Sequence, residues 1–270
     1  MSMRGRQKPR ASLKRPSWPA VRATLLGKLG EAIVSGYFTE EKKYELVGGV
    51  VHWRSIWRNI FNEKKDPEEL TENDIDRIIQ EEVEKKLKNM CCNVNEDIRR
   101  MVLDRMRRAI KKLKSNKNKR FNPDLVLRKT GRITVVEIQL WPVWLQRQHR
   151  SSKLTWKVIE KEGVALFPRV LAKSVCIRDG EKRHSRRKGK EEKGEEISEF
   201  LYVSYSRSDS DHNEIKCVFD AICPARFDIL YFDEILKEVC GETWFLDFLK
   251  EAKKEIDKLF NGLRKGKLSW

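Results

Sequence analysis

The segment 120–141 constrains the fold of this chain more than any other part of the sequence. It contains two apolar runs, 125–127 and 133–140, which are joined by the residues RKTGR with a glycine at position 131. Short runs rich in leucine and β-branched residues, connected by a glycine-containing loop, are typical of a β-hairpin. The sequence therefore predicts two paired strands in this segment.

The second of these strands carries a carboxylate on a face that is otherwise apolar. Successive side chains of a strand point to opposite faces, so Glu137 and Gln139 share a face with Ile133 and Val135. A buried charge must be paired, hydrogen-bonded or bound to a metal ion. Asp124 opens the first strand, and antiparallel pairing brings it near Glu137. Two neighbouring carboxylates suggest a divalent cation between them, Mg²⁺ or Mn²⁺ rather than zinc.

This pattern resembles the PD-(D/E)XK nuclease superfamily. Pro123 and Asp124 match the first part of the motif, and Glu137 matches the acidic residue after twelve intervening positions. Gln139 stands where the family has lysine. The family also tends to carry a glutamate on a helix before the hairpin, and Glu31 in the helical pattern GKLGEAIV corresponds to it.

The resemblance implies an α/β fold with a central mixed β-sheet flanked by helices, a restriction-endonuclease-like core. It covers residues 22–36 and 120–160, and the charge-rich block between these segments has the character of an insertion. We therefore expect three parts: a basic flexible arm at 1–20, a core at 21–62 and 120–270, and a helical-hairpin insertion at 63–119. A solubilising tail and an organelle presequence are alternative interpretations of the arm.

The resemblance further implies a metal-dependent endonuclease that hydrolyses phosphodiester bonds, with DNA as the expected substrate. Asp124, Glu137 and the carbonyl group of Ile138 would hold Mg²⁺ or Mn²⁺, and Glu31 would complete the coordination shell through water or hold a second ion. Such an ion lowers the pKa of a bound water molecule and neutralises charge on the attacked phosphate.

The glutamine at position 139 departs from the family pattern in a way that matters for catalysis. Gln139 can orient a water molecule by hydrogen bonding, but it cannot supply positive charge. Lys153 or Arg150, on a helix expected over 142–160, is a candidate for that charge. Otherwise catalysis is slow, or the protein is a catalytically inactive nucleic-acid-binding or assembly protein on the same fold.

The charge balance points to a polyanionic partner. The chain has 58 Lys and Arg against 41 Asp and Glu, giving a net charge of +17. Nucleic acid is therefore the first partner to consider, although a basic protein with no such partner remains the alternative.

No run approaches the roughly 18 apolar residues of a membrane span, which predicts no membrane association. We expect an intracellular protein, cytoplasmic or nucleoid-associated, with reduced thiols.

The second helix of the insertion is the most basic part of the chain outside its ends. Residues 95–120 contain eleven Lys or Arg and three Asp or Glu, a balance of +8. We interpret this helix as a phosphate-contacting surface, with a merely solvated face as the alternative. The candidate contacts are Arg107, Arg108, Lys111, Lys112 and Arg120.

Periodicity predicts the remaining elements. The apolar and aromatic stripe of the last helix suits the protein core, with the seam of a homodimer as the alternative. The expected elements are helices at 22–37 and 233–260, a strand or hairpin at 44–53 with its turn at Gly48 and Gly49, a strand within 164–177, a charged loop at 178–196, and strands at 200–206, 215–222 and 227–232.

Overall fold

A computed structural model describes most of the chain. The described residues are 28, 30–61, 70–90, 94–115, 120–139, 154–178, 194–204, 207 and 210–240. Four predicted features lie wholly or largely outside them: the basic arm at 1–20, the helix at 142–153, the charged loop at 179–193 and the helix after residue 240.

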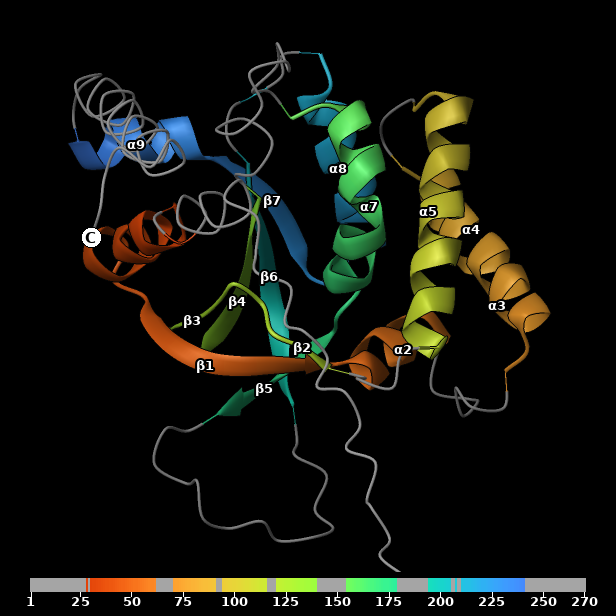
Figure 1. The fold of residues 1–270 in the computed structure, drawn as a ribbon, viewed down its shortest axis with the longest axis horizontal. Helices are drawn as coiled ribbons and strands as arrows, with labels where there is room; N and C mark the ends of the chain where they lie inside the picture. The colour runs from red at the N-terminus through yellow and green to blue at the C-terminus, as the bar shows by residue number, and fades with distance from the viewer. Residues whose placement is uncertain are drawn as a thin grey trace, which may run out of the picture.

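Within the described residues, seven strands form one mixed β-sheet (Figure 1). The strands pair in the order β2, β1, β3, β4, β6 and β7. Because β5 pairs with both β6 and β1, the five strands β1, β3, β4, β6 and β5 close into a ring. β4, β6 and β7 are parallel to one another, and the other pairs are antiparallel. The expected mixed α/β class is confirmed. The bounds are β1 (Glu45–His52), β2 (Arg120–Phe121), β3 (Leu125–Lys129), β4 (Arg132–Gln139), β5 (Ser174–Arg178), β6 (Glu195–Ser204) and β7 (Arg226–Tyr231).

The hairpin predicted from the sequence is formed by β3 and β4. Lys129 pairs with Arg132, which leaves a two-residue turn. Thr130 and Gly131 both have positive φ, 48° and 75°. Positive φ at both central residues is the signature of a type I′ turn, whose twist matches that of the flanking strands. The hairpin is confirmed, and its loop is shorter than the five residues expected.

The strand expected at 44–53 is confirmed as β1, whereas the alternative of a hairpin with its turn at Gly48 and Gly49 is wrong. The strand runs through both glycines, leaving β3 after Val47 and pairing next with β5. A Cβ atom on Gly49 would lie 2.7 Å from Cγ2 of Val126 and 2.9 Å from Cγ2 of Val175. The glycine therefore permits a close approach between strands rather than a reversal of the chain.

Helices cover both faces of the sheet (Figure 1). Residues 30–36 are α-helical and continue into a π-helical turn, η1 (Tyr37–Glu41). The first helix of the insertion begins with a capping box between Thr71 and Asp74. None of the described helices has the length and apolar character needed to cross a membrane. The other bounds are α2 (Trp53–Phe61), α3 (Glu72–Ile78), η2 (Ile79–Val83), α4 (Glu84–Lys88), α5 (Glu96–Ser115), α7 (Trp156–Val170), α8 (His212–Ile222) and α9 (Phe232–Cys240).

One predicted strand is a helix, and another is confirmed at the end of the segment expected to contain it. Residues 215–222 form most of α8, because Ile215, Val218, Phe219 and Ile222 recur at the helical period and are all buried. Residues 164–170 belong to α7, which continues through Pro168 for two further residues. The strand expected within 164–177 is confined to β5. Apolar runs of this length do not distinguish a strand from a buried helix by periodicity alone.

The sheet separates two apolar clusters. The larger cluster packs α5, α7 and α8 against one face, and it includes Ile133 and Val135 of β4. The smaller cluster packs residues 33–44 and α9 against the other face, and it includes Val136 and Ile138 of the same strand. The alternation predicted for this strand is therefore confirmed, and Glu137 follows Val135 on the face of the larger cluster.

One cysteine departs from the expectation of reduced thiols. Cys217 on α8 is disulfide-bonded, whereas Cys176 and Cys223 carry reduced thiols. The side chain of its partner lies outside the described residues. Disulfides are rare in intracellular proteins of most organisms but common in those of hyperthermophiles, whose proteins are also rich in Lys and Glu.

Replacing Phe219 tests the placement of α8 in the larger cluster. Its ring is fully buried and stacks on Phe167 and Phe227, with ring centroids 5.1 Å apart in both pairs. We expect Phe219→Ala to lower the free energy of unfolding by about 3–5 kcal/mol in urea denaturation. Val239→Ala, at a side chain that is 41% exposed on α9, is the control and should cost under about 0.5 kcal/mol. Equal, small losses would contradict this packing.

Candidate active site

Asp124 and Glu137 meet at the start of β3 and the end of β4. Leu125 pairs with Val136, and continuing this register by one residue sets Asp124 opposite Glu137. Directly opposed residues of an antiparallel pair point to the same face with Cβ atoms about 5 Å apart. The backbone N–H of Ile138 donates a hydrogen bond to Oδ2 of Asp124 at 2.7 Å, which fixes this carboxylate against β4.

Glu137 is a buried carboxylate paired with an arginine from another element. Its side chain is 3% exposed, and Oε2 accepts a hydrogen bond from Nη1 of Arg169 near the end of α7. The guanidinium group also lies over the ring of Phe121, with 5.7 Å between its Cζ atom and the ring centroid. The arginine is 34% exposed, so it connects the buried carboxylate to the surface.

The pKa values of both carboxyl groups are raised. Burial raises the pKa of Glu137 to about 8, the charge of Arg169 opposes this shift, and the charge of Asp124 adds to it. Burial is also the main reason that the pKa of Asp124 is raised, while its hydrogen bond from Ile138 opposes the change. Two carboxylates in one poorly solvated site resist simultaneous ionisation unless positive charge joins them.

Glu31 lies beside this pair as half of an ion pair. Lys28 donates a hydrogen bond to the Glu31 carboxylate on the first helix, and both residues are close enough to Asp124 to shift its pKa in opposite directions. The hydrogen bond with Glu31 is in turn the main reason that the pKa of Lys28 is raised. Lys28 and Glu31 thus influence Asp124 through their charges, whereas Arg169 contacts Glu137 directly.

Two other predicted site residues follow Glu137 on β4. Gln139 is the last residue of β4 and is half-buried, with its backbone paired to Ser204 of β6. The backbone N–H of Ile138 donates a hydrogen bond to Asp124, and the metal contact expected of its carbonyl oxygen stays a prediction. Arg150 and Lys153 lie outside the described residues.

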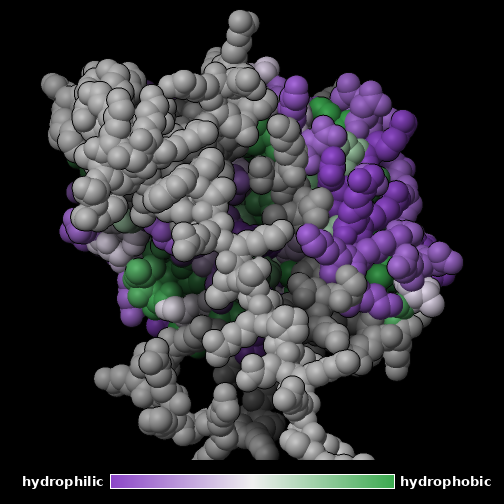
Figure 2. Space-filling view, viewed as in Figure 1, coloured by the Kyte–Doolittle hydropathy of each residue, from purple (hydrophilic) through white to green (hydrophobic). Residues whose placement is uncertain are grey.

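The basic residues predicted for phosphate contacts are partly engaged with acidic and polar neighbours. Arg107 donates to Gln80, Arg108 lies 2.9 Å from Asp104, and Lys111 lies 2.8 Å from Asp76, in each case between side-chain atoms. Lys112 and Arg120 are exposed. Figure 2 shows a continuous hydrophilic surface over α3, α4 and α5. Its positive charge is thus partly neutralised within the protein.

Sequence reasoning missed Arg169 and Lys28. Arg169 lies 32 positions from Glu137, in a segment predicted as strand, so no local pattern connected the two residues. The spacing of Trp156, Ile159 and Phe167 was the available signal for a helix there. Lys28 stands three positions before Glu31, one helical turn away, and that spacing was visible in the sequence.

The site has donors for a divalent cation without forming a complete cage. Oε1 of Glu137 is buried and has no hydrogen-bond partner, which leaves one acceptor oxygen unused beside Asp124. Among the described residues, no group of three or more His, Cys, Asp or Glu is arranged to hold a metal ion. Mg²⁺ is often held by only one or two carboxylates and keeps several water molecules, so the pair fits this type of site.

Comparison of this chain with family models, with curated proteins and with solved structures gave no significant match. The site is therefore interpreted from its own geometry and chemistry.

Replacing the buried carboxylate tests its electrostatic environment. Because the pKa of Glu137 is raised in the folded state, its contribution to stability is lost as pH rises from about 4.5, the ordinary value, to about 8. With EDTA present, we expect Glu137→Gln to raise Tm relative to wild type by an amount that grows over this range and is constant above it. Calorimetry at pH 5, 7 and 9 measures the difference.

Glu196→Gln, at an exposed position on β6, is the matched control and should show little dependence of this kind. A Tm difference for Glu137→Gln that does not vary with pH would show that Glu137 is ionised as easily in the folded chain as in the unfolded one.

Proposed function

We propose that this protein is a divalent-cation-dependent nuclease that hydrolyses phosphodiester bonds, with DNA as its substrate. The observation that carries the proposal is the pair of opposed carboxylates, Asp124 and Glu137, whose pKa values are both raised and which retain an unpartnered buried oxygen. A buried acidic pair costs stability, and perturbed groups of this kind concentrate at functional sites.

The arrangement of elements supports a restriction-endonuclease-like core. A helix carrying Glu31 precedes the β3–β4 hairpin, and α7 follows it in the chain. Glu31 comes close enough to Asp124 to raise its pKa, as expected for an acidic residue that joins the site from the first helix. β6 then lies parallel to β4, which makes the sheet mixed next to the candidate active strand.

Mg²⁺ or Mn²⁺ fits the oxygen donors present. Asp124 and Glu137 would hold it, with Glu31 close enough to act on Asp124 through its charge, and among the described residues no cysteine or histidine joins the site to favour zinc. The ion would supply a water molecule of lowered pKa and neutralise charge on the phosphate.

The protein's own residues have separable roles in this proposal. Arg169 supplies the positive charge that Gln139 lacks, because its partly exposed guanidinium group can contact a phosphate while it also touches Glu137. Fixed donors of this kind stabilise negative charge that develops during the reaction. Lys28 adds a second cation near Asp124. Gln139 would orient the attacking water by hydrogen bonding.

The net charge of +17 supports nucleic acid as the partner. The exposed residues Lys112 and Arg120 are the proposed phosphate contacts from the predicted set. Arg107, Arg108 and Lys111 would first have to exchange their present partners for phosphate oxygens. A homodimer through the helix at 233–260 remains a proposal, since most of that helix lies outside the described residues.

One observation favours a second function, a nucleic-acid-binding protein without catalysis. The described residues contain no complete metal-holding group, and Gln139 replaces the usual lysine. In that case Arg169 permanently neutralises Glu137, and the site is a remnant without catalytic activity.

A cleavage assay separates the two functions. Full-length protein with Mn²⁺ is incubated with linear, nicked and junction DNAs and with RNAs. We expect cleavage by wild type, none by Glu137→Ala, and a rate about 10²- to 10³-fold lower for Arg169→Gln, because a fixed charge-stabilising donor is lost. Lys85→Gln, at an exposed position on α4, is the control and should cleave at the wild-type rate.

Cleavage that persists in Glu137→Ala would place the activity at another site or in a contaminant. Tight binding without cleavage in all four proteins would support the non-catalytic function instead.

A further inference from the structure

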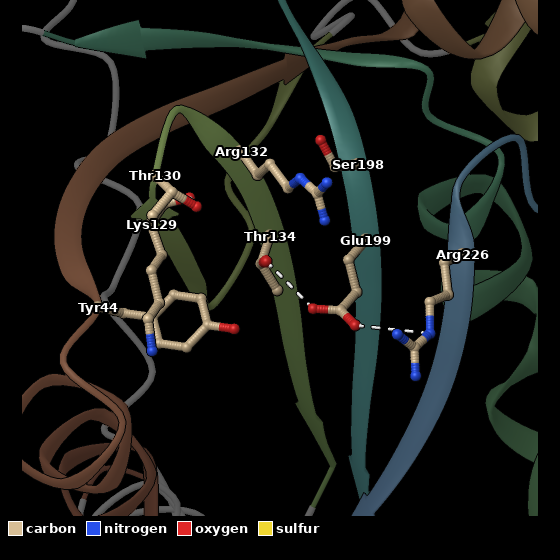
Figure 3. Close-up of a pocket in the computed structure, with 8 residues that line it drawn as sticks. All are labelled: Tyr44, Lys129, Thr130, Arg132, Thr134, Ser198, Glu199 and Arg226. Atoms are coloured by element: carbon tan, nitrogen blue, oxygen red, sulfur yellow. Dashed lines mark hydrogen bonds and ion pairs between the residues drawn. The ribbon is translucent and has the colours of Figure 1, made fainter.

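A cavity apart from the carboxylate pair is lined by residues of β4, β6 and β7 and of the β3–β4 turn (Figure 3). It has a volume of about 240 Å³ and is formed where β4, β6 and β7 begin, next to the β3–β4 turn. Arg132, which lines it, precedes Glu137 by five residues on β4, a distance of about 17 Å along an extended strand. None of the acidic residues of the candidate active site lines this cavity.

Among the described residues, three cations and one carboxylate line the cavity. The cations are Lys129, Arg132 and Arg226, and the carboxylate is Glu199. Glu199 is already engaged: its Oε2 accepts a hydrogen bond from Thr134 at 3.2 Å, and its Oε1 lies 3.9 Å from Nε of Arg226. The lining therefore carries a surplus of two positive charges.

Arg132 is the cation most available to a ligand. Lys129 donates to the carbonyl oxygen of Lys42 at 2.5 Å and lies over the ring of Tyr44, and Arg226 is shared between Glu199 and Asp228. By contrast, neither a hydrogen bond nor an ion pair of the Arg132 side chain occurs in the described part of the chain. Figure 3 shows its guanidinium group extending across β4 towards Ser198 and Glu199.

Hydroxyl groups complete the lining. Tyr44, Thr130 and Ser198 each contribute one, and the Tyr44 hydroxyl points towards the middle of the cavity (Figure 3). Hydroxyls beside arginine and lysine form a donor-rich surface that suits an anion with several acceptor oxygens. The polar lining disfavours an apolar ligand, and the surplus charge disfavours a cation.

We propose that this cavity binds a phosphomonoester group. A phosphomonoester carries up to two negative charges at neutral pH, which matches the two surplus positive charges of the lining. A volume of about 240 Å³ is enough for a phosphate group and part of an attached sugar. Arg132 provides the planar, bidentate fork that recognises phosphate oxygens.

The phosphate has two chemical sources, a free nucleotide or the phosphorylated end of a nucleic acid. This proposal goes beyond the nuclease function, since the cavity contains neither Asp124 nor Glu137. The two proposals are therefore independent, and the failure of one does not decide the other.

Calorimetric titration of the full-length protein at low ionic strength, with EDTA present, tests the proposal. The probes are inorganic phosphate, a nucleoside 5′-monophosphate, and one short single-stranded DNA prepared with either a 5′-phosphate or a 5′-hydroxyl end. We expect phosphate and the monophosphate to bind, and Arg132→Gln to weaken both by about tenfold or more. Glu199→Gln should tighten both, because it removes the carboxylate that the described residues contribute to the lining.

The matched control is Lys85→Gln, which also removes one positive charge but at an exposed position on α4 that does not line the cavity. This variant should bind the probes like wild type. Tighter binding of the 5′-phosphorylated DNA than of the 5′-hydroxyl DNA, lost in Arg132→Gln, would identify a nucleic-acid end as the source. Equal binding of the two DNAs would identify a free nucleotide or phosphate. Absence of phosphate and monophosphate binding, or equal affinity in wild type and Arg132→Gln, would overturn the proposal.

Discussion

The contact between Glu137 and Arg169 is the interaction on which the candidate active site depends. A carboxylate that is 3% exposed on a central strand is costly, and the guanidinium group from α7 offsets part of that cost. Burial still dominates, so the pKa of Glu137 remains raised to about 8. The pair also connects α7 to β4 across the larger apolar cluster, so the position of this helix and the chemistry of the strand are determined together.

The sheet explains how acidic residues from distant segments meet. β1 leaves β3 after Val47, and the close approach permitted by Gly49 lets it turn towards β5. Among the described residues, β1 therefore pairs with β3 only as far as Val126, and the start of β3 has no neighbouring strand on the β1 side. Asp124 lies at this unpaired start, close enough to Lys28 and Glu31 for their charges to shift its pKa. The parallel strands β4, β6 and β7 begin at the other end, where the basic cavity lies. The two ends of the sheet thus have opposite electrostatic character.

Local signals in the sequence were sufficient for the hairpin and for the pair of carboxylates. The type I′ turn at Thr130 and Gly131 fixes the register, and the register brings Asp124 opposite Glu137. Arg169 could not be predicted in the same way, because its contact depends on how α7 packs over the sheet and not on neighbouring residues. The helix at 215–222 was missed because its run of apolar residues also suits a strand, and tertiary packing decides between the two.

Titration of metal-free protein with Mn²⁺, followed by electron paramagnetic resonance, tests the central claim that Asp124 and Glu137 form one cation site. The account predicts at least one bound Mn²⁺ ion per wild-type chain, and loss of that ion in both Asp124→Asn and Glu137→Gln. Lys85→Gln should retain it. Mn²⁺ binding that is absent from wild type, or that survives unchanged in either carboxylate variant, would contradict the account.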